Sequence, residues 1–287
     1  MKAIYKKEVK SYLTSMIGYV FIFFILLLEG IYFTAYNLQN AYPLFGTTLS
    51  AVTFIFLILV PVLTMKTIAE ERKQKTDQLL LTAPVSVSEI VLGKFLAVAT
   101  VYAIPVLIIC LYPMIMGKYG TVSYAMAYTA VLGFALLGFA QIAVGVFWSS
   151  VTENPVIAAV VTFIVLFVCY MITGIGSLIP DSSIASLACY MLLVLLAAVW
   201  VYHMIRNLWI AAVIGIAGEA ALAITYVVKS TLFEGSIQKF LAVFDITSHF
   251  DNFTNGILDL QGVVYFLSVI IIFLVLTVQT ITKRRWN

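Results

Sequence analysis

Long apolar runs separated by short polar stretches dominate this sequence. Eight of them lie near residues 17–36, 49–69, 92–116, 122–148, 155–179, 184–204, 207–228 and 263–282. Each approaches or exceeds the roughly 20 residues that a helix needs to cross a bilayer. The runs are continuous rather than alternating in polarity, which favours helices over barrel strands. The pattern predicts an all-α polytopic membrane protein with about eight transmembrane helices, forming a single transmembrane domain over residues 1–287.

The composition excludes a water-soluble protein. Hydrophobic residues make up 63% of the chain and charged residues 10%, whereas a soluble domain carries roughly 25% charged residues. The first apolar run is too long for a cleavable signal peptide and follows a charged amphipathic stretch, so we expect a retained span. Cys110, Cys169 and Cys189 all lie in apolar runs without metal-ligand spacing, which favours a packing role.

The basic residues predict the orientation. With an even number of spans both ends lie on one side, and placing the N-terminus inside puts 13 of the 16 Lys and Arg residues in the cytoplasm. Only Lys118, Lys229 and Lys239 then lie outside. We therefore expect a multi-pass protein of the plasma (inner) membrane with cytoplasmic N- and C-termini.

Two segments outside the spans have amphipathic patterns. Residues 1–16 place Tyr5, Val9, Tyr12, Leu13 and Met16 on one helical face and Lys6, Lys7 and Lys10 on another. This pattern predicts an interfacial helix whose lysines face anionic lipid headgroups, the alternative being a topology signal only. Residues 229–262 predict an extracytoplasmic segment with short amphipathic helices that cap the bundle.

The most highly charged stretch is the cytoplasmic loop over residues 70–91. Good helix formers over 70–81, with Glu71–Lys75 and Lys73–Asp77 pairs at i,i+4, predict a helix that continues the second span. Pro84 ends it.

A second helix follows this proline. Ser86 and Glu89 have the spacing of a capping box, and Val85 and Ile90 that of a hydrophobic staple. The loop is thus a helix–turn–helix hairpin, which either docks into a groove on a soluble partner or serves as a stiff connector.

This hairpin resembles that of ABC-2 type (type V) transporter permeases, whose pattern runs roughly E-E-R-x-x-G-T-x-E-x-L-L-x-x-P-V-S-x-x-E-I-V-L-G-K. The matching residues are Glu70, Glu71, Arg72, Thr76, Leu79, Leu80, Pro84, Val85, Ser86, Glu89, Ile90, Val91, Leu92, Gly93 and Lys94. Lys75 stands where glycine is usual, and Gln78 where an acid is usual, with Asp77 one place earlier.

The C-terminal part is similar to the gliding-motility branch of that family. The residues that carry this likeness are His249, Phe250, Phe253, Gly256, Asp259, Tyr265, Phe266, Leu267, Arg284, Arg285 and Trp286. The family has a six-helix core, so the chain adds an extra pair of spans within about 180–228 (the likeness is weak over 180–235).

The resemblance implies a half-transporter. Two permeases, either two copies or two related chains, would pair in the membrane, and each would dock an ABC ATPase that binds ATP and Mg. The implied ATPase-coupling residues are Glu70, Glu71, Arg72, Thr76, Asp77, Leu79, Leu80, Pro84, Val85, Ser86 and Glu89. The implied outer gate is formed by His249, Phe250, Phe253, Gly256 and Asp259. Membrane lipids and an extracytoplasmic accessory protein are further candidate partners, and no nucleic acid is expected.

No enzyme motif is present in the chain. A phosphate-binding loop at Gly93-Lys94 would need glycine at Ser88 and Ser or Thr at Phe95. ATP hydrolysis is therefore expected in a partner subunit, with no cofactor in this chain. Asp245, His249 and Asp251 could be imagined as a metal cluster, but one histidine with helix-capping acids favours a structural role. We expect no metal site.

Three polar residues within predicted spans are candidates for the translocation path. Glu29, Gln141 and Glu219 are costly in lipid and should face the bundle interior or a wet cavity. Their alternative role is an interhelical hydrogen bond.

The leading hypothesis is the permease subunit of an ATP-driven ABC-2 exporter. Two rivals stay open at this point: a multipass membrane enzyme acting on lipid or glycan, and a non-transporting mechanotransmission scaffold. The residues name no substrate.

Overall fold

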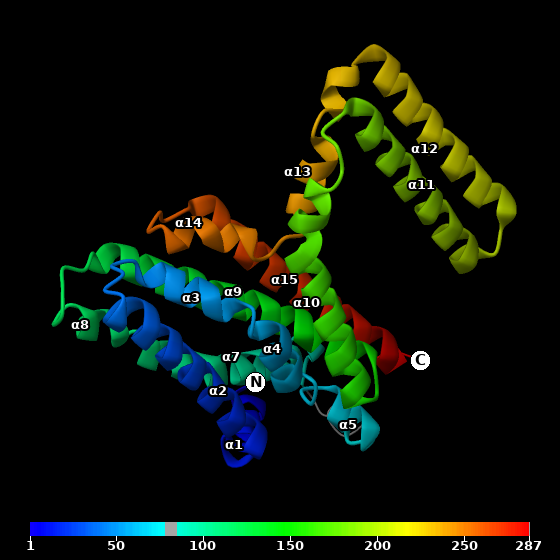
Figure 1. Ribbon diagram of the computed structural model, residues 1–287. Helices are drawn as coiled ribbons and strands as arrows, with labels where there is room; N and C mark the ends of the chain where they lie inside the picture. The colour runs from blue at the N-terminus through cyan, green and yellow to red at the C-terminus, as the bar shows by residue number, and fades with distance from the viewer. Residues whose placement is uncertain (78–84, 287) are drawn as a thin grey trace. The chain divides into compact units, whose positions relative to one another are not determined.

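The computed structural model describes residues 1–77 and 85–286, and these residues form helices and turns with no strand among them (Figure 1). The elements up to the hairpin are α1 (Lys2–Thr14), α2 (Met16–Tyr32), the π-helix η1 (Phe33–Gln39), α3 (Phe45–Thr53), α4 (Phe56–Thr64) and α5 (Ala69–Lys73). After it come α7 (Val87–Ile109), α8 (Tyr112–Met116), α9 (Tyr124–Val151), α10 (Pro155–Ser177), α11 (Ser183–Ile205) and α12 (Leu208–Val228). The last are η2 (Ser230–Phe233), α13 (Ser236–Ala242), η3 (Ser248–Phe250), α14 (Asp251–Thr254) and α15 (Leu260–Trp286).

The all-α polytopic fold is confirmed, and the described residues contain five to seven candidate spans where about eight were expected. Five helical stretches within the described residues are long and apolar enough to cross a membrane: Met16–Gln39, Val87–Met116, Tyr124–Val151, Pro155–Ser177 and Leu260–Arg284. Two bent pairs raise the number to seven, Phe45–Thr53 with Phe56–Thr64 (60°) and Ala212–Val228 with Ser230–Ala242 (116°). The helix α11 (Ser183–Ile205) contains a further apolar stretch, Ser183–Val199.

The chain divides into two compact units. Unit 1 comprises Met1–Val168 and Ile246–Asn287, and unit 2 comprises Cys169–Asp245. The boundary after Val168 falls within α10. The interpretation of residues 1–287 as a single domain stays a prediction.

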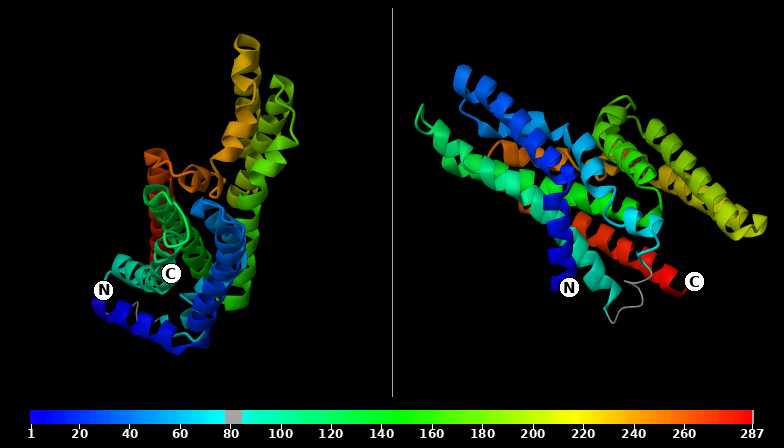
Figure 2. Two further views of the ribbon diagram at one scale, coloured as in Figure 1. Left: turned by 60° about the vertical axis from the view of Figure 1, so that its left-hand side comes forward. Right: turned by 90° about the horizontal axis from the view of Figure 1, so that it is seen from below.

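Unit 1 is built around α9, which packs against α3, α4, α7, α14 and α15 (Figures 1 and 2). Small residues on α9 let large side chains reach its backbone. Gly138 receives the ring of Tyr102, whose hydroxyl donates to the carbonyl of Phe134 at 2.7 Å. Gly145 receives Thr64 from α4 in the same way. In lipid such close packing replaces the hydrophobic driving force between helices.

The segment before α15 closes over α9 and α3. Phe250 and Phe253 are buried, and both rings lie against Gly133. On the other side, Gly46 of α3 touches the backbone of Thr254 so closely that a Cβ at this position would overlap the Thr254 carbonyl.

Unit 2 is a helical hairpin, α11 and α12, with a short helical cap. Gly218 of α12 lies against Val194 of α11, which lets the two helices approach. At the cap, Gln238 Nε2 donates to the carbonyl of Ile179 at 2.9 Å, and Thr173 Oγ1 donates to Asp245 Oδ2 at 2.6 Å.

We expect Gly46→Ala to lower the thermal midpoint of the purified protein in detergent. The added methyl group overlaps backbone rather than a movable side chain, and such overpacking costs about 1–3 kcal/mol. Gly120→Ala is the matched control, because a Cβ there meets nothing within 4 Å. Equal midpoints for the two variants would contradict the close contact between α3 and the Thr254 backbone.

Candidate functional site

Charged residues from five parts of unit 1 meet at the end of the bundle that carries the hairpin. They come from α1, α5, the first turns of α7, the α9–α10 junction and the last turns of α15. Ion pairs and hydrogen bonds connect all five, as the next paragraphs describe, so the hairpin is fixed to the bundle through side chains distant in sequence.

Lys94 of α7 is the most deeply buried charge of this cluster. Its side chain is 1% exposed, and its ammonium lies 3.0 Å from Glu8 Oε1 and 2.8 Å from Glu71 Oε2. It also donates to the carbonyl of Thr67 at 2.8 Å. A buried ammonium is tolerated only when paired and fully hydrogen-bonded. These contacts join α1, the α4–α5 turn and α7 at one point.

Tyr12 of α1 reinforces this junction. Its hydroxyl donates to the carbonyl of Leu63 at 3.2 Å or shares a hydrogen bond with Thr67 Oγ1 at 3.0 Å. Burial raises the pKa of Tyr12 well above its usual range, so the phenol stays protonated. The interfacial helix predicted over residues 1–16 corresponds to α1, which is joined to the bundle by this phenol and by the Glu8 carboxylate.

Arg72 of α5 makes the second connection. Its Nη1 donates to the carbonyl of Ser150, and its Nη2 lies 3.7 Å from Glu153 Oε1. Arg284 of α15 pairs with the same Glu153 oxygen and, at 3.4 Å, with Asp77 Oδ2. Burial, and then the neighbouring Arg284, lower the pKa of Arg72. The hairpin is thereby tied to the α9–α10 junction and to the last helix.

Ser149 of α9 determines where α5 begins. Its hydroxyl accepts from the backbone N–H groups of Ile68 and Ala69, both at 3.1 Å, and donates to the carbonyl of Met65 at 3.1 Å. One side chain therefore satisfies three backbone groups at the break between α4 and α5. The helix predicted to continue unbroken from the second span into residues 70–81 is wrong for this reason.

The end of α5 shows why the family pattern has glycine at the position of Lys75. The N–H of Thr76 bonds to the carbonyl of Glu71 at 3.0 Å, and the N–H of Lys75 to that of Arg72 at 3.1 Å. This is a Schellman motif, whose C′ residue adopts the left-handed conformation that glycine favours. Lys75 occupies that position with φ 57°. The family pattern has glycine where this chain places a lysine in a strained conformation.

The predicted i,i+4 pairs of the hairpin, Glu71–Lys75 and Lys73–Asp77, are also wrong. Glu71 binds Lys94, and Asp77 binds Arg284. Long-range partners displace the local ones because α5 ends before Lys75, and positions four apart no longer share a helical face.

The predicted capping box at the start of α7 is confirmed. The backbone N–H of Glu89 donates to Ser86 Oγ at 3.3 Å, and that of Ser86 donates to Glu89 Oε2 at 3.4 Å. The box fixes the direction in which the hairpin enters the third span.

The candidate coupling residues fall into an inner and an outer group. Glu71 and Arg72 face the bundle and have structural partners. Thr76, Ser86 and Glu89 are exposed, and Glu70, Asp77 and Val85 are half-buried. Leu79, Leu80 and Pro84 lie outside the described residues. Their coupling role stays a prediction.

The candidate outer gate is a compact segment before α15. The ring of His249 stacks on Tyr265 with centroids 3.7 Å apart, and Gly256 has φ 77° beside Met126. Asp259 accepts from Asn252 Nδ2 and from the backbone N–H of Gln261, both at 2.9 Å. The hydrogen bond from Asn252 lowers the pKa of Asp259. A gating role stays a prediction.

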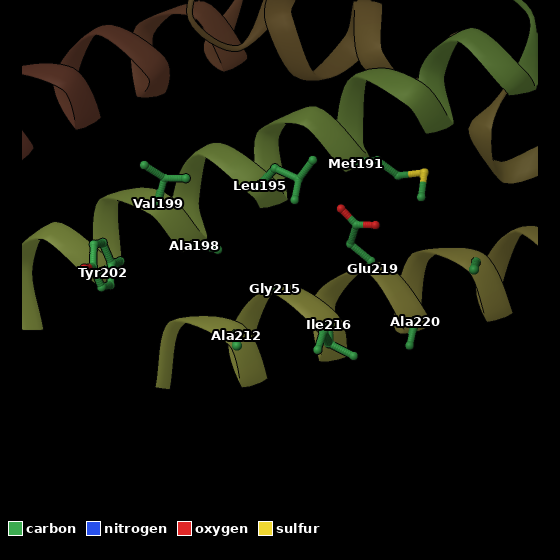
Figure 3. A pocket seen from close by; sticks show the side chains of 11 residues that line it. Met191, Leu195, Ala198, Val199, Tyr202, Ala212, Gly215, Ile216, Glu219 and Ala220 are labelled. Carbon is green, nitrogen blue, oxygen red and sulfur yellow. The ribbon is translucent and has the colours of Figure 1, made fainter. Parts of the chain in front are cut away.

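The candidate path residues lie on three different helices. Glu29 (α2) and Gln141 (α9) are buried in unit 1, and neither Glu29 carboxylate oxygen nor Gln141 Oε1 has a hydrogen-bond partner among residues 1–77 and 85–286. Glu219 (α12) belongs to unit 2. Its carboxylate points toward Met191 and Leu195 of α11, in a cavity otherwise lined almost entirely by apolar side chains (Figure 3). Whether the three line a path stays a prediction.

The candidate coupling residues did not include four members of the charged cluster, Glu8, Lys94, Glu153 and Arg284, although Lys94 and Arg284 were among the residues that carry the resemblance. Among these four, Lys94 could have been recognised most easily as a buried, paired charge, because it is a lone lysine in the apolar sequence that follows the capping box. In the part of the chain that the structure describes, no group of three His, Cys, Asp or Glu residues could hold a metal ion.

Comparison with known proteins gave one finding. A family model described as ABC-2 family transporter protein matches residues 2–284. A search of curated proteins found no match.

We expect Lys94→Met to destabilise the protein by about 3–5 kcal/mol, because it leaves two buried carboxylates without their shared cation. Lys7→Met is the matched control: Lys7 reaches the same Glu71 at 3.4 Å, but its side chain is 67% exposed. An exposed pair contributes at most about 1 kcal/mol. Thermal midpoints in detergent measure the difference, and equal losses would contradict the buried junction.

We expect Lys75→Gly to stabilise the protein by about 1 kcal/mol, because glycine relieves the left-handed strain. Lys73→Gly, within α5, should instead destabilise it by a similar amount. The measurement is again the thermal midpoint, supported by the rate of limited proteolysis within the hairpin. A loss of stability in Lys75→Gly would show that the lysine is not strained.

Proposed function

Because the chain belongs to the ABC-2 family of transporter proteins, we propose that it is the membrane-spanning permease subunit of an ATP-driven exporter. The observation that carries this proposal is the connection between the hairpin and the bundle. Lys94 links α5 to α1 and α7, and Arg72 links α5 to the α9–α10 junction.

This arrangement supports a role for the hairpin as a lever. A force on its exposed side would reach α7 and α9 directly, because buried charge-assisted bonds resist separation. The motion of an ATPase during ATP binding would in this way tilt the helices of the bundle. ATP and Mg would be bound by that ATPase.

The exposed residues of the hairpin define the surface available to the ATPase. Lys73 is exposed at the end of α5, as are Gln74, Lys75 and Thr76 after it. Ser86, Ser88 and Glu89 are exposed at the start of α7. Glu71 and Arg72 would contribute indirectly, by holding this surface in place.

The remaining parts of the proposal follow the family. Two permeases, identical or related, would form the transport unit, with the hairpins in the cytoplasm together with both termini and the protein in the plasma (inner) membrane. Glu29, Gln141 and Glu219 would line the route, and the segment from His249 to Asp259 would gate it. The likeness of this segment to the gliding-motility branch makes an extracytoplasmic accessory protein a candidate partner.

The test is co-purification with the cognate ATPase, identified by its phosphate-binding loop among proteins captured with the tagged full-length chain. We expect the triple variant Lys73→Glu, Gln74→Glu, Thr76→Glu to lose the ATPase, because three added negative charges alter the proposed docking surface. The matched control is Lys118→Glu, Tyr119→Glu, Thr121→Glu, in the exposed turn between α8 and α9.

Two results would contradict the proposal. The first is retention of the ATPase by the hairpin variant at the level of the control. The second is turnover of a lipid or glycan by the purified chain in vesicles without ATP or any partner. ATPase stimulation without a detectable transported species would instead favour a mechanotransmission role.

A further inference from the structure

A polar cavity of about 310 Å³ lies between α1, the start of α2 and the α4–α5 turn. Its volume is at the lower end of the range for small-molecule sites, roughly 300–1,000 Å³. The α1 side contributes Lys7, Glu8 and Ser11, and the α4–α5 side contributes Lys66 and Glu70. Of these residues only Glu8 takes part in the lever, so the cavity calls for a separate account.

The charges around this cavity balance, but they are not all paired. Three cations (Lys7, Lys66, Lys94) and three anions (Glu8, Glu70, Glu71) line it, which gives a net charge of zero. Lys94 engages both Glu8 and Glu71. That leaves Lys66 and Glu70 on the α4–α5 side, and the exposed Lys7 on the α1 side, accessible to a ligand.

The groups that a ligand can reach are two lysines, one hydroxyl and one carboxylate. Lys66 is exposed and forms no ion pair with any residue of the described ranges. Lys7 lies 3.4 Å from Glu71, but its side chain is 67% exposed, and Ser11 is also exposed. Glu70 accepts one hydrogen bond, from Gln74 Nε2 at 2.9 Å. A ligand with a phosphate and an ammonium would complement both the lysines and the carboxylate.

The surroundings of the cavity identify the source of such a ligand. Ile17, in the first turn of α2, lines the cavity. On the same face of α2, two turns further along, Phe24 is 43% exposed, and Val20 between them is half-buried. In a membrane span these residues face hydrocarbon. A molecule that places its charged head in the cavity can therefore lay acyl chains along α2.

We propose that this cavity binds the headgroup of a phospholipid that carries both a phosphodiester and a primary ammonium. The phosphodiester would take charge-assisted hydrogen bonds from Lys66 and Lys7, and the ammonium would donate to Glu70. A trimethylammonium has no N–H to donate, and a headgroup with negative charge only would face the Glu70 carboxylate. The site therefore distinguishes aminophospholipids from choline lipids and from anionic lipids that have no ammonium group.

The experiment measures lipid binding to the delipidated full-length chain in detergent, without an ATPase. Phosphatidylethanolamine, phosphatidylcholine and phosphatidylglycerol are titrated separately, and thermal midpoint and native mass spectrometry report bound lipid. We expect phosphatidylethanolamine to bind at least about tenfold more tightly than the other two, the ratio expected when one charge-assisted hydrogen bond is lost. Equal binding of all three lipids would overturn the proposal.

Substitutions of cavity residues test whether the lipid binds in this cavity. Lys66→Gln and Glu70→Gln should each weaken phosphatidylethanolamine binding about tenfold. Lys10→Gln, an exposed lysine of α1 outside the cavity, should leave it unchanged. The midpoints without lipid check that each variant is folded. Unchanged affinity in both cavity variants would overturn the proposal.

A last measurement compares the lipid with a soluble molecule that has the same headgroup. Glycerophosphoethanolamine keeps the phosphodiester and the ammonium of the lipid but has no acyl chains to lie along α2. We expect its binding to be weaker by a factor of 100 or more, on the order of that for burying a few methylene groups. Binding as tight as that of the lipid would exclude the membrane as the source.

Discussion

The buried ammonium of Lys94 is the constraint on which the hairpin depends. A charge removed from water at this depth must have its counter-charges close by, and here they come from two segments that are 63 residues apart (Glu8 and Glu71). The contacts of Lys94 therefore determine together the positions of α1, α5 and the first turns of α7. Moving one of them would separate charges in a medium of low dielectric, which is why the three can be expected to move as one body.

This constraint changes the interpretation of the family's hairpin residues. Glu71 and Arg72 match the family pattern, yet their side chains are engaged within the chain. In the proposed function, such residues would preserve the shape of the docking surface without forming part of it. The exposed side of the hairpin is then free to differ between relatives, and this freedom would let each permease recognise its own ATPase while the lever beneath stays the same.

Features that depend on neighbouring residues could be predicted from the sequence, and features that depend on distant residues could not. The apolar runs predicted an all-helical membrane protein, and Ser86 with Glu89 predicted the capping box. The prediction of a helix over 70–81 that continues the second span was wrong because Ser149, some 80 positions away, binds the backbone N–H groups of Ile68 and Ala69 where the helix is interrupted. The ion pairs of the hairpin failed for the same reason, since Lys94 and Arg284 take the acids that local spacing assigned elsewhere. Where the apolar runs predicted about eight spans, the described residues contain five to seven, depending on whether each bent pair is one span, and the length of an apolar run does not show such bends.

The left-handed backbone at Lys75 has a consequence for how relatives of this chain can be recognised. Only glycine, and to a lesser degree asparagine and aspartate, adopts this conformation without strain. A lineage that keeps the short α5 should therefore show a narrow choice of residues at this one position, even where the surrounding loop diverges freely. A β-branched residue there would mark a chain in which α5 does not end at this turn. One residue would then separate two forms of the hairpin that composition and hydropathy cannot distinguish.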